Sequence, residues 1–452
     1  MPAAFIIDEL QRRVMPVDLS AAGRPSAYPR RPRFWPWWFC IWLACNVSGV
    51  AIAMILWPKG EAARGAWFWL CFAGFPNGAF VFLFAIERAG YEALWYRAHW
   101  RNEFRTRWLA ERLRAAQKPL QVLGIGYSLP LGVEPAQTLA EAMARKKRLP
   151  ASQVPRAGSK PVEHARFCEA DWLVDEPVVI DGFAGNEETP DFGAPAQVSL
   201  LTLKIARALE ALAVSLRALA CYERQWWPQV RVLSVPGSEQ ADVARVIDAL
   251  RIAGLPPLAV QASPATDGLM VADAWLDAKE ARPLLVVATA WHEKGPPEGS
   301  TEGCVVVLLS PGHFRLPEAV TVVALLHRPV RAIDGEAEYG FANAAVWGKA
   351  GSASLVRAWI TRPVEGCDRA LSAAHMDAIA KDDTQLRPDR VVGDMGDANG
   401  WLAVAAAVEA GAADGPQLIA DGLQSAVLRV MPATTDNNRI TDDRPQAFPA
   451  TA

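Results

Sequence analysis

Two uncharged apolar runs near the N-terminus constrain this chain more than any other feature. Residues 34–57 (FWPWWFCIWLACNVSGVAIAMILW) and residues 66–86 (AWFWLCFAGFPNGAFVFLFAI) contain no charged side chain. Each run is long enough for a helix to cross a hydrocarbon core of about 30 Å, and tryptophans stand near the run ends, as at membrane interfaces. We therefore predict two transmembrane helices within residues 34–87. The alternatives are a buried hairpin of a soluble domain and a signal peptide, for which the first run starts too late in the chain.

The basic residues that flank these runs predict their orientation. Four arginines lie between residues 24 and 33, and eight Lys or Arg side chains lie in residues 88–118. The connection between the runs holds only Lys59 and Arg64. By the positive-inside rule both flanks face the cytoplasm, so we expect residues 1–33 to be a cytoplasmic segment. Two helices are few for a transporter, and we interpret them as an anchor.

Residues 88–118 are polar, basic and rich in helix-forming side chains. We predict that they form a juxtamembrane helix that continues the second apolar run. Their Lys and Arg side chains suit anionic lipid headgroups. A helix face that is merely solvated accounts for the same residues, and the sequence leaves both interpretations open.

Composition excludes several classes of function. The 452-residue chain has a formal net charge of −3, so it has no overall field that would attract a polyanion, and we expect no nucleic-acid partner. Its seven cysteines form no CxxC pair and no Cys/His ligand pattern. We therefore expect no disulfide framework, as is typical of a protein in a reducing compartment. We also expect no metal and no cofactor.

Residues 119–432 have the pattern of one α/β domain. Apolar, β-branched runs alternate with helical stretches at residues 120–129, 230–235, 283–290 and 304–310. This pattern is typical of a sheet that is buried on both faces. We expect a mostly parallel sheet in which strand 121–125 lies beside the strand that ends at Ala262. Residues 433–452 are polar and contain prolines, which predicts a flexible tail.

Four segments resemble β-ketoacyl synthases, in the order in which that family has them. LQVLGIGYSLPLGVEPAQTLAEAMA, residues 120–144, resembles the opening strand, glycine turn and helix. EGCVVVLLS (302–310) resembles the strand after the nucleophile, GDMGDANGWLAVAAAVEAG (393–411) resembles the Gly-His-Thr-Gly loop and its helix, and DGLQSAVLRV (421–430) resembles the last strand. The resemblance covers residues 119–432. It implies a thiolase-like layered domain of two similar α/β halves in five layers, here in a trimmed form.

The resemblance also implies which positions should carry chemistry. In this family a cysteine at a helix entrance attacks the acyl thioester, and two histidines support the reaction. The cysteine belongs in the turn within residues 258–275, where this chain has Ser263. The first histidine belongs near residues 355–363, which contain none, and Asp394 takes the place of the second. A carboxylate repels a developing oxyanion, so we interpret Ser263 and Asp394 as degenerate positions and expect no catalytic residue.

What remains at these positions is a glycine-rich turn with carboxylates, which fits the close packing turn of the family. The candidate pocket consists of Ser263, Thr266, Asp267, Gly393, Asp394, Gly396 and Gly400. Isolated residues elsewhere are interpreted as structural, namely His292, His313, His327, His375 and Cys304.

Two classes of function fit this pattern. Inactive thiolase-like proteins of this kind resemble members encoded in bacterial type VI secretion effector loci. That resemblance implies an adaptor or scaffold in the bacterial inner membrane, with both termini and the main domain in the cytoplasm. Its expected partners are the bilayer and an effector or secretion component, and a homodimer is a further candidate assembly. The alternative is an acyltransferase that acts on acyl thioesters or lipid with displaced catalytic residues.

Overall fold

The computed structural model describes residues 22–31, 36–60, 62–131, 138–156, 158, 160–167, 198–292, 295–381 and 383–432. The predicted flexible tail of residues 433–452 lies outside these ranges. The chain forms two compact units, of which the smaller is Asp18–Arg114 and the larger contains Ala115–Ala452. Each unit is described by itself.

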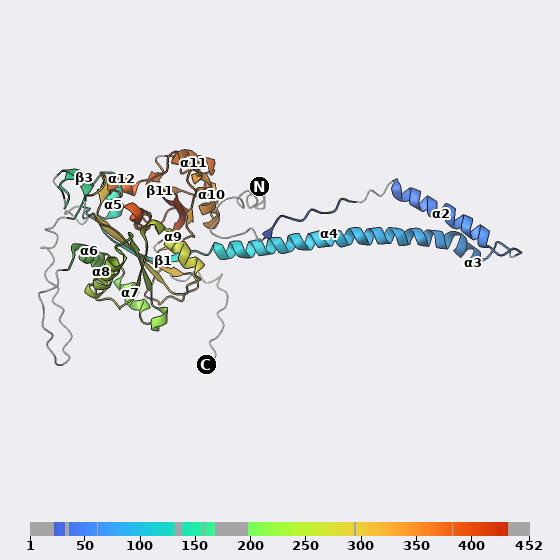
Figure 1. Ribbon diagram of the computed structural model, residues 1–452, viewed down its shortest axis with the longest axis horizontal. Coiled ribbons are helices and arrows are strands. Elements are labelled where there is room, and N and C mark those ends of the chain that lie inside the picture. The colour runs from blue at the N-terminus through green and yellow to red at the C-terminus, as the bar shows by residue number, and fades with distance from the viewer. Residues whose placement is uncertain are drawn as a thin grey trace. The chain divides into compact units, whose positions relative to one another are not determined.

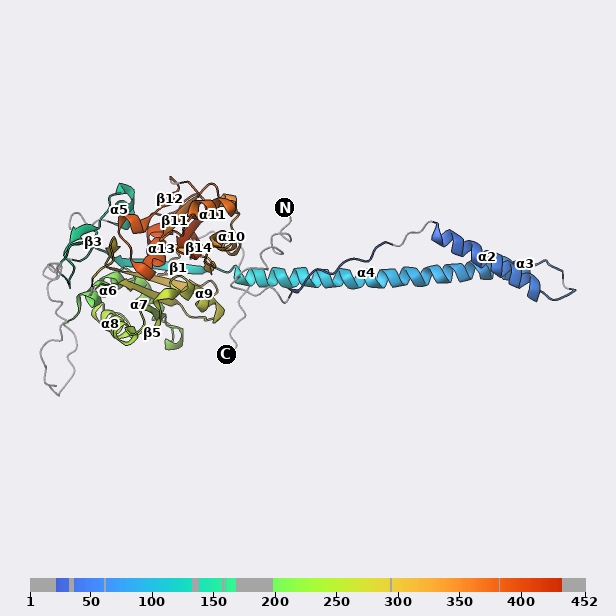
Figure 2. The same cartoon turned by 45° about the horizontal axis from the view of Figure 1, so that its top comes forward.

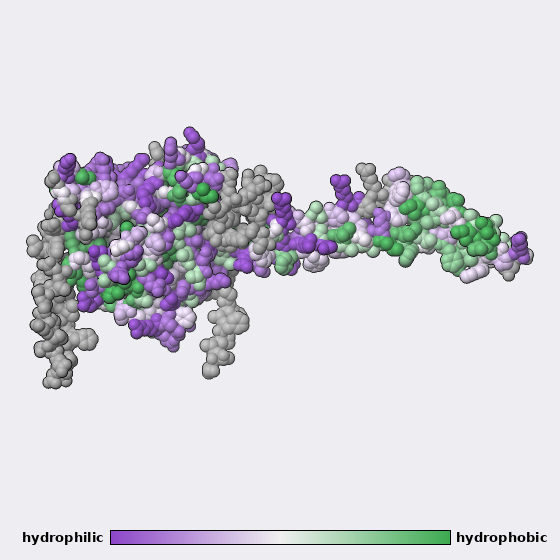
Figure 3. All heavy atoms as spheres, viewed as in Figure 1, coloured by the Kyte–Doolittle hydropathy of each residue, from purple (hydrophilic) through white to green (hydrophobic). Residues whose placement is uncertain are grey.

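The smaller unit is a helical hairpin whose two arms are long and apolar enough to cross a membrane. The first arm is α2 (Trp37–Leu56). The second arm begins with α3 (Ala66–Trp69), passes through a π-helical turn (Leu70–Gly74) and runs on as α4 (Phe75–Ala116). Figure 3 shows apolar surface over the hairpin and charged residues along the rest of α4. Pro76 has no N–H to donate, which accounts for the widened turn just before it.

Polar side chains and a close backbone approach join the two arms. Asn77 donates to Oδ1 of Asn46 at 3.1 Å and accepts from the indole Nε1 of Trp42 at 2.9 Å. Gly49 lies so close to Pro76 that a Cβ there would stand 2.3 Å from the proline Cγ. Such interactions hold helices together in lipid, where the hydrophobic effect supplies no attraction between them.

The larger unit contains an eleven-stranded sheet and a three-stranded sheet among its described residues. The strands of the first half of the large sheet are β1 (Leu120–Ser128), β4 (Gln229–Ser234), β5 (Ala259–Pro264), β6 (Leu284–Ala290) and β8 (Gly303–Pro311). Those of the second half are β9 (Ala324–Leu326), β10 (Val330–Arg331), β11 (Arg357–Thr361), β12 (Gln385–Leu386), β13 (Gln417–Asp421) and β14 (Gln424–Val430). The small sheet consists of β2 (Ala151–Gln153), β3 (Val162–Ala165) and β7 (Ser300–Thr301).

The two halves of the large sheet repeat one strand order. The first half runs β5-β4-β6-β8-β1 and the second runs β12-β11-β13-β14-β9, with β10 paired beside β14. In each half the first three of these strands are parallel, and the fourth is antiparallel to both of its neighbours. The halves meet where β1 pairs with β9. This repeat confirms the α/β, thiolase-like class of two similar halves.

Helices cover both faces of the large sheet, so the domain is built in layers. The helices of the domain are α5 (Leu139–Arg145), α6 (Leu200–Glu210), α7 (Ala213–Leu219), α8 (Glu239–Ile252), α9 (Met270–Asp277), α10 (Ala337–Trp347), α11 (Cys367–Ala373), α12 (Pro388–Val391) and α13 (Asn399–Glu409). Helices α6, α7 and α8 pack on one face of β8 through Val306, while Val305 on its other face packs with α9 and α13. Helix α13 also packs on β11, β13 and β14, and α10 packs on β14 and α11. Figures 1 and 2 show α6 and α8 on one side of the domain and α10 and α11 on the other.

The predicted neighbourhood of strand 121–125 is wrong. This strand and the strand that ends near Ala262 correspond to β1 and β5, and β8, β6 and β4 lie between them. The sheet is also mixed rather than mostly parallel, because β8 and β14 run against their neighbours. Apolar periodicity identifies strands but carries no information on their spatial order.

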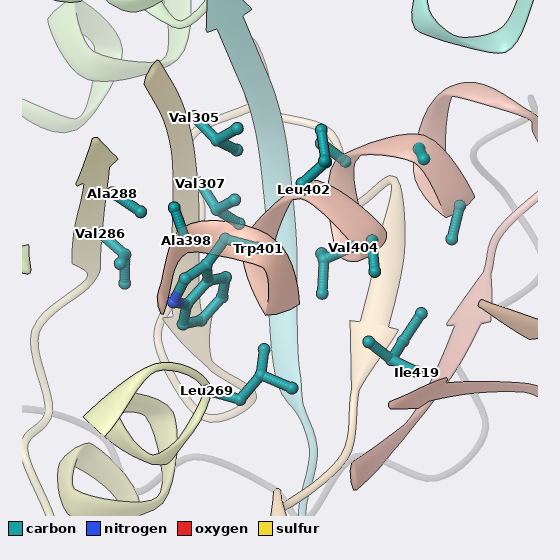
Figure 4. Packing of buried hydrophobic residues seen from close by; sticks show 14 of the residues in the cluster. Leu269, Val286, Ala288, Val305, Val307, Ala398, Trp401, Leu402, Val404 and Ile419 are labelled. Atoms are coloured by element: carbon teal, nitrogen blue, oxygen red, sulfur yellow. The ribbon is translucent and has the colours of Figure 1, made fainter. Parts of the chain in front are cut away.

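The central layer is built around α13. Its sequence, NGWLAVAAAVE, is apolar on every side, as expected for a helix that is buried all round. Trp401 is fully buried, and its Nε1 donates to the carbonyl of Gly268 at 3.0 Å. Figure 4 shows Trp401 and Leu402 of this helix facing the sheet residues Val305 and Val307. The start of α13 therefore meets the entrance of α9, as the glycine loop of residues 393–400 predicts.

Replacing Trp401 by Ala should lower the free energy of unfolding by about 3–5 kcal/mol, because the change empties a buried site and leaves the Gly268 carbonyl without its donor. Urea denaturation of the full chain in detergent, followed by circular dichroism, measures the loss. Trp226→Ala, at a residue that is 41% exposed, is the matched control and should cost less than about 1 kcal/mol. Equal losses in the two variants would contradict the central role of Trp401.

Candidate functional site

Three segments meet where the two halves bring their equivalent helices together. They are the entrance of α9 at Gly268 and Leu269, the loop of residues 393–399 before α13, and the ends of β11 and β13. In each half the strand at the outer end of the sheet comes before one of these central helices, because β5 is followed by α9, and β12 is followed by α12 and then α13. The resemblance to β-ketoacyl synthases places its chemistry in this region.

The entrance of α9 carries a leucine, and its backbone donor is already engaged. Leu269 is the residue just before the helix, and its N–H donates to Oε1 of Gln424 at 2.7 Å in a buried contact. Nε2 of the same Gln424 donates to the carbonyl of Thr266 at 3.2 Å. Gln424 begins β14, so the second half of the sheet closes the helix entrance of the first half.

The assignment of Ser263 to this helix entrance is wrong. Strand β5 continues through Ser263, which pairs with Leu233 of β4, and α9 begins only at Met270. A short 3₁₀ turn (Ala265–Asp267) separates the strand from the helix. Of the other candidate residues in this turn, Thr266 contributes its carbonyl and exposes its side chain, and Asp267 is half-buried.

The loop before α13 uses its first carboxylate to shape itself. Oδ1 of Asp394 accepts from the N–H of Gly396 at 2.7 Å and from Nδ2 of Asn399, whose Oδ1 accepts from the N–H of Met395. The backbone of Asp394 also pairs with the small sheet, because its N–H donates to Gly299 and its carbonyl accepts from Thr301. Asp394 is thus a turn-forming residue that is held on both sides.

Two of the candidate glycines are required by close contacts. Gly393 has φ 113°, and a Cβ there would stand 2.9 Å from Cβ of Thr301. A Cβ at Gly400 would stand 2.8 Å from Cγ of Leu269. Gly396 also has a positive φ, of 60°, but a Cβ there would meet no other atom within 4 Å. The glycines therefore serve backbone conformation and packing.

A buried ion-pair network occupies the end of β11. Arg362 donates from Nε and Nη2 to the two carboxylate oxygens of Asp421, at 2.8 and 2.7 Å, and from Nη1 to Asp397 at 3.2 Å. Its own N–H donates to Asp389 at 3.0 Å. Arg362 has φ 43°, a left-handed conformation that is unusual for a residue with a side chain. The end of this strand is the position at which the resemblance places the first histidine.

Burial and charge act against each other in this network. Burial raises the pKa of Asp421 and of Asp389, and the guanidinium of Arg362 lowers that of Asp421. Burial lowers the pKa of Arg362, but the hydrogen bonds and charges of Asp421 and Asp397 raise it by more, so the pKa of this guanidinium lies above its usual value and it stays protonated. A guanidinium that is held by carboxylates in this way does not offer its charge to a substrate.

One of the isolated histidines, His292, lies within electrostatic reach of Asp394 in the loop before α13, together with Glu302 and His164. His313 and His375 are exposed, His292 is half-buried after β6, and His327 is buried after β9. Burial lowers the pKa of His292, and burial raises the pKa of the Cys304 thiol inside β8. A thiol with a raised pKa is a poor nucleophile. Within the described ranges, no three His, Cys, Asp or Glu side chains are arranged to hold a metal ion.

Sequence reasoning located the loop and the helix entrance but missed Arg362, Asp421 and Gln424. Each of them stands at the end of a strand of the second half: Arg362 directly follows β11, Asp421 is the last residue of β13, and Gln424 begins β14. The only signal was the dipeptide Arg-Pro after an apolar strand, which by itself indicates a strand end rather than an ion pair.

Comparisons with known proteins describe the fold only. No protein-family model and no curated protein matches this chain. The solved peroxisomal 3-ketoacyl-CoA thiolase of Saccharomyces cerevisiae is similar with a TM-score of 0.38 and 12% identity, over 51% of this chain and 90% of that one. The 3-oxoacyl-[acyl-carrier-protein] synthase III of Aquifex aeolicus gives a TM-score of 0.38 and 12% identity, over 69% and 99%.

A third similar structure is the C-terminal type III polyketide synthase domain of Steely1 from Dictyostelium. It has a TM-score of 0.39 and 12% identity, and the match covers 69% of this chain and 99% of that one. It is the repeated strand order in the two halves, rather than these overall similarities, that makes the domain thiolase-like.

Replacing Arg362 by Ala should destabilise the protein by about 3 kcal/mol, because it leaves the buried Asp421 carboxylate without its cation. Urea denaturation of the full chain measures the loss, and adding Asp421→Asn should restore most of it. The exposed pair of Arg251 and Asp248 provides the control, since Arg251→Ala should cost under about 1 kcal/mol. A loss below 1 kcal/mol for Arg362→Ala would show that the network is not buried as described.

The buried His327 should make stability depend on pH. Burial, with Arg429 and Lys349 nearby, lowers the pKa of His327 from 6.5 to about 4. The unfolded chain therefore takes up a proton below about pH 6.5 that the folded protein refuses until about pH 4, so stability falls as pH drops through this window. Across this pH window, the free energy of unfolding of His327→Gln should fall by about 3 kcal/mol less than that of the wild type. His313→Gln, at an exposed site, should follow the wild type in the same titration, and parallel curves for all three proteins would refute the assignment.

Proposed function

We propose that this protein is a membrane-anchored, catalytically inactive thiolase-like protein that acts as an adaptor or scaffold. The observation that carries the proposal is the entrance of α9, where Leu269 stands in place of a nucleophile and its N–H is bound by Gln424. Acyl transfer needs a nucleophile beside donors that are free to stabilise an oxyanion. This entrance offers neither at Leu269.

The rest of the site supports the same proposal. Arg362, at the strand end where the family has a histidine, is held by Asp421 and Asp397. The carboxylate of Asp394 accepts a hydrogen bond from the N–H of Gly396 and so stabilises its own turn. Both charges of such a pair already have their hydrogen-bond partners, so the pair helps to specify the fold rather than to react with a substrate. The domain keeps the layered scaffold, and the polar groups described above at the two helix entrances are bound to one another rather than available to a thioester.

The anchor is the second part of the proposal. Two helices of the chain could cross a membrane, and the basic flanks favour an inner membrane of a bacterium with both termini and the domain in the cytoplasm. A folded, unreactive domain held at that surface suits a protein that presents a partner, such as a secretion effector. The resemblance to proteins of type VI secretion loci points to that system, with an effector or secretion component as partner and a homodimer as a further candidate assembly.

The test is acyl transfer by the full chain in detergent. Incubation with labelled acyl-coenzyme A or acyl carrier protein, followed by intact mass measurement, should give no adduct and no turnover, while a β-ketoacyl synthase treated in parallel gives both. The proposal fails if an adduct forms that disappears in Ser263→Ala, or if turnover disappears in Asp394→Ala. Either result would favour the alternative of an acyltransferase with displaced residues.

A further inference from the structure

A band of aromatic and cationic side chains lies along α4 beyond the apolar hairpin. Tyr96, Trp100 and Phe104 are 53%, 61% and 71% exposed. They repeat every four residues and so form one ridge of the helix surface. Arg97, Arg101 and Arg105 follow them by one residue each and form a parallel ridge. We call these six residues the aromatic–arginine band.

The extended segment of residues 22–31 packs on α4, where the carbonyl of Gly23 accepts from Nε of Arg105 at 2.9 Å, and it leaves the three aromatic side chains of the band exposed. Asn102 fixes the segment with two hydrogen bonds to the backbone of Ser26, of 2.8 and 2.9 Å. Further along, Tyr28 packs on Trp95 with 5.7 Å between ring centroids. Between segment and helix lies a groove of about 700 Å³, which Arg24 lines together with residues of the band.

Among the residues that the structure describes, no carboxylate pairs with the arginines of this groove. Arg24, Arg97 and Arg101 are exposed and make no ion pair or hydrogen bond with any residue that the structure describes. Elsewhere on α4, by contrast, Arg107 pairs with Glu103 at 3.0 Å. Uncompensated arginines beside exposed aromatic rings are typical of a surface that a partner covers, since Trp, Tyr and Arg supply most of the binding energy of interfaces.

Distance along the helix argues against lipid headgroups as that partner. Trp38, at the start of α2, packs on Phe84 with 5.1 Å between ring centroids, so the two apolar arms end at a common level near Ile86. Tyr96 lies ten residues further on, or about 15 Å at 1.5 Å per residue. The headgroup layer extends only about 5–8 Å beyond the hydrocarbon core. The band therefore stands clear of the bilayer surface.

The geometry points to a docking site for an acidic, amphipathic helix of a partner protein. Two parallel ridges with four-residue spacing fit a helix that carries an apolar ridge beside a ridge of Asp or Glu. A second copy of α4 would instead place arginine against arginine, which charge repulsion disfavours. This inference deepens the proposed adaptor function, on which it rests, by naming the chemistry of the partner and the surface that receives it.

Photo-crosslinking in the cells that make the protein tests the docking site. Benzoylphenylalanine replaces Phe104 in the full-length chain, and the matched control carries it at Thr106, an exposed position on the opposite side of α4. We expect position 104 to give a covalent adduct with one other protein, at least fivefold above position 106. Mass spectrometry of the crosslinked peptide should identify a segment with acidic and apolar side chains at four-residue spacing.

A second experiment reverses the charge of two arginines of the band. Arg97→Glu with Arg101→Glu should reduce the crosslink at position 104 at least fivefold. Arg224→Glu with Arg251→Glu changes the net charge equally at exposed positions of the larger unit and should leave the crosslink within twofold. The amounts of each protein in the membrane fraction are compared by immunoblot, so that a loss of folding is not mistaken for a loss of docking.

Several outcomes would overturn the inference. They are an adduct with lipid only, an adduct with a second copy only, a crosslinked segment without acidic residues, and a crosslink that survives the reversal of Arg97 and Arg101. Benzoylphenylalanine at Trp226, on the surface of the domain, separates the two levels of the proposal. A protein adduct at 226 with none at 104 rejects the band and keeps the adaptor, whereas acyl transfer by the purified chain rejects the adaptor itself.

Discussion

The contact between the entrances of α9 and α13 fixes the rest of the domain. The indole of Trp401 donates to the carbonyl of Gly268, and Leu269 fills the space that Gly400 leaves open. Each helix comes after the outer strand of its half, β5 or β12, so this contact sets the register in which the two halves face each other. A side chain at residue 400, or a smaller one at residue 401, would separate the central layer from both sheets.

The same contact determines what the region can do chemically. With the helix entrances packed against each other, the donors and charges around them are used internally, by Gln424 on Leu269 and by Asp421 on Arg362. Carboxylates outnumber cations here, since Asp389, Asp397 and Asp421 all contact Arg362. This surplus of carboxylates is one reason for the proposed inactivity, because carboxylates repel the negative charge that develops on a reacting thioester.

Sequence reasoning went furthest where a pattern has one physical meaning. Uncharged runs of sufficient length indicated the two apolar arms, and residues 393–411 indicated a glycine loop that is followed by a helix. It failed where the outcome depends on partners that are distant in the chain. The order of β1, β8 and β5 depends on which faces the helices cover, and the exact helix start after Ser263 depends on a short turn. Arg362 and Asp421 are 59 residues apart, so no local pattern could have joined them.

The position of β1 has a mechanical consequence. This strand comes directly after the anchoring helix in the chain, and it is paired along its length with β8 and at its start with β9. A pull on the anchor is therefore borne by a central strand that two neighbours hold at once, rather than by an edge strand that can peel away one hydrogen bond at a time. In the anchored protein proposed above, tension on α4 would have to break the pairing of β1 with both β8 and β9 before it could draw this strand out.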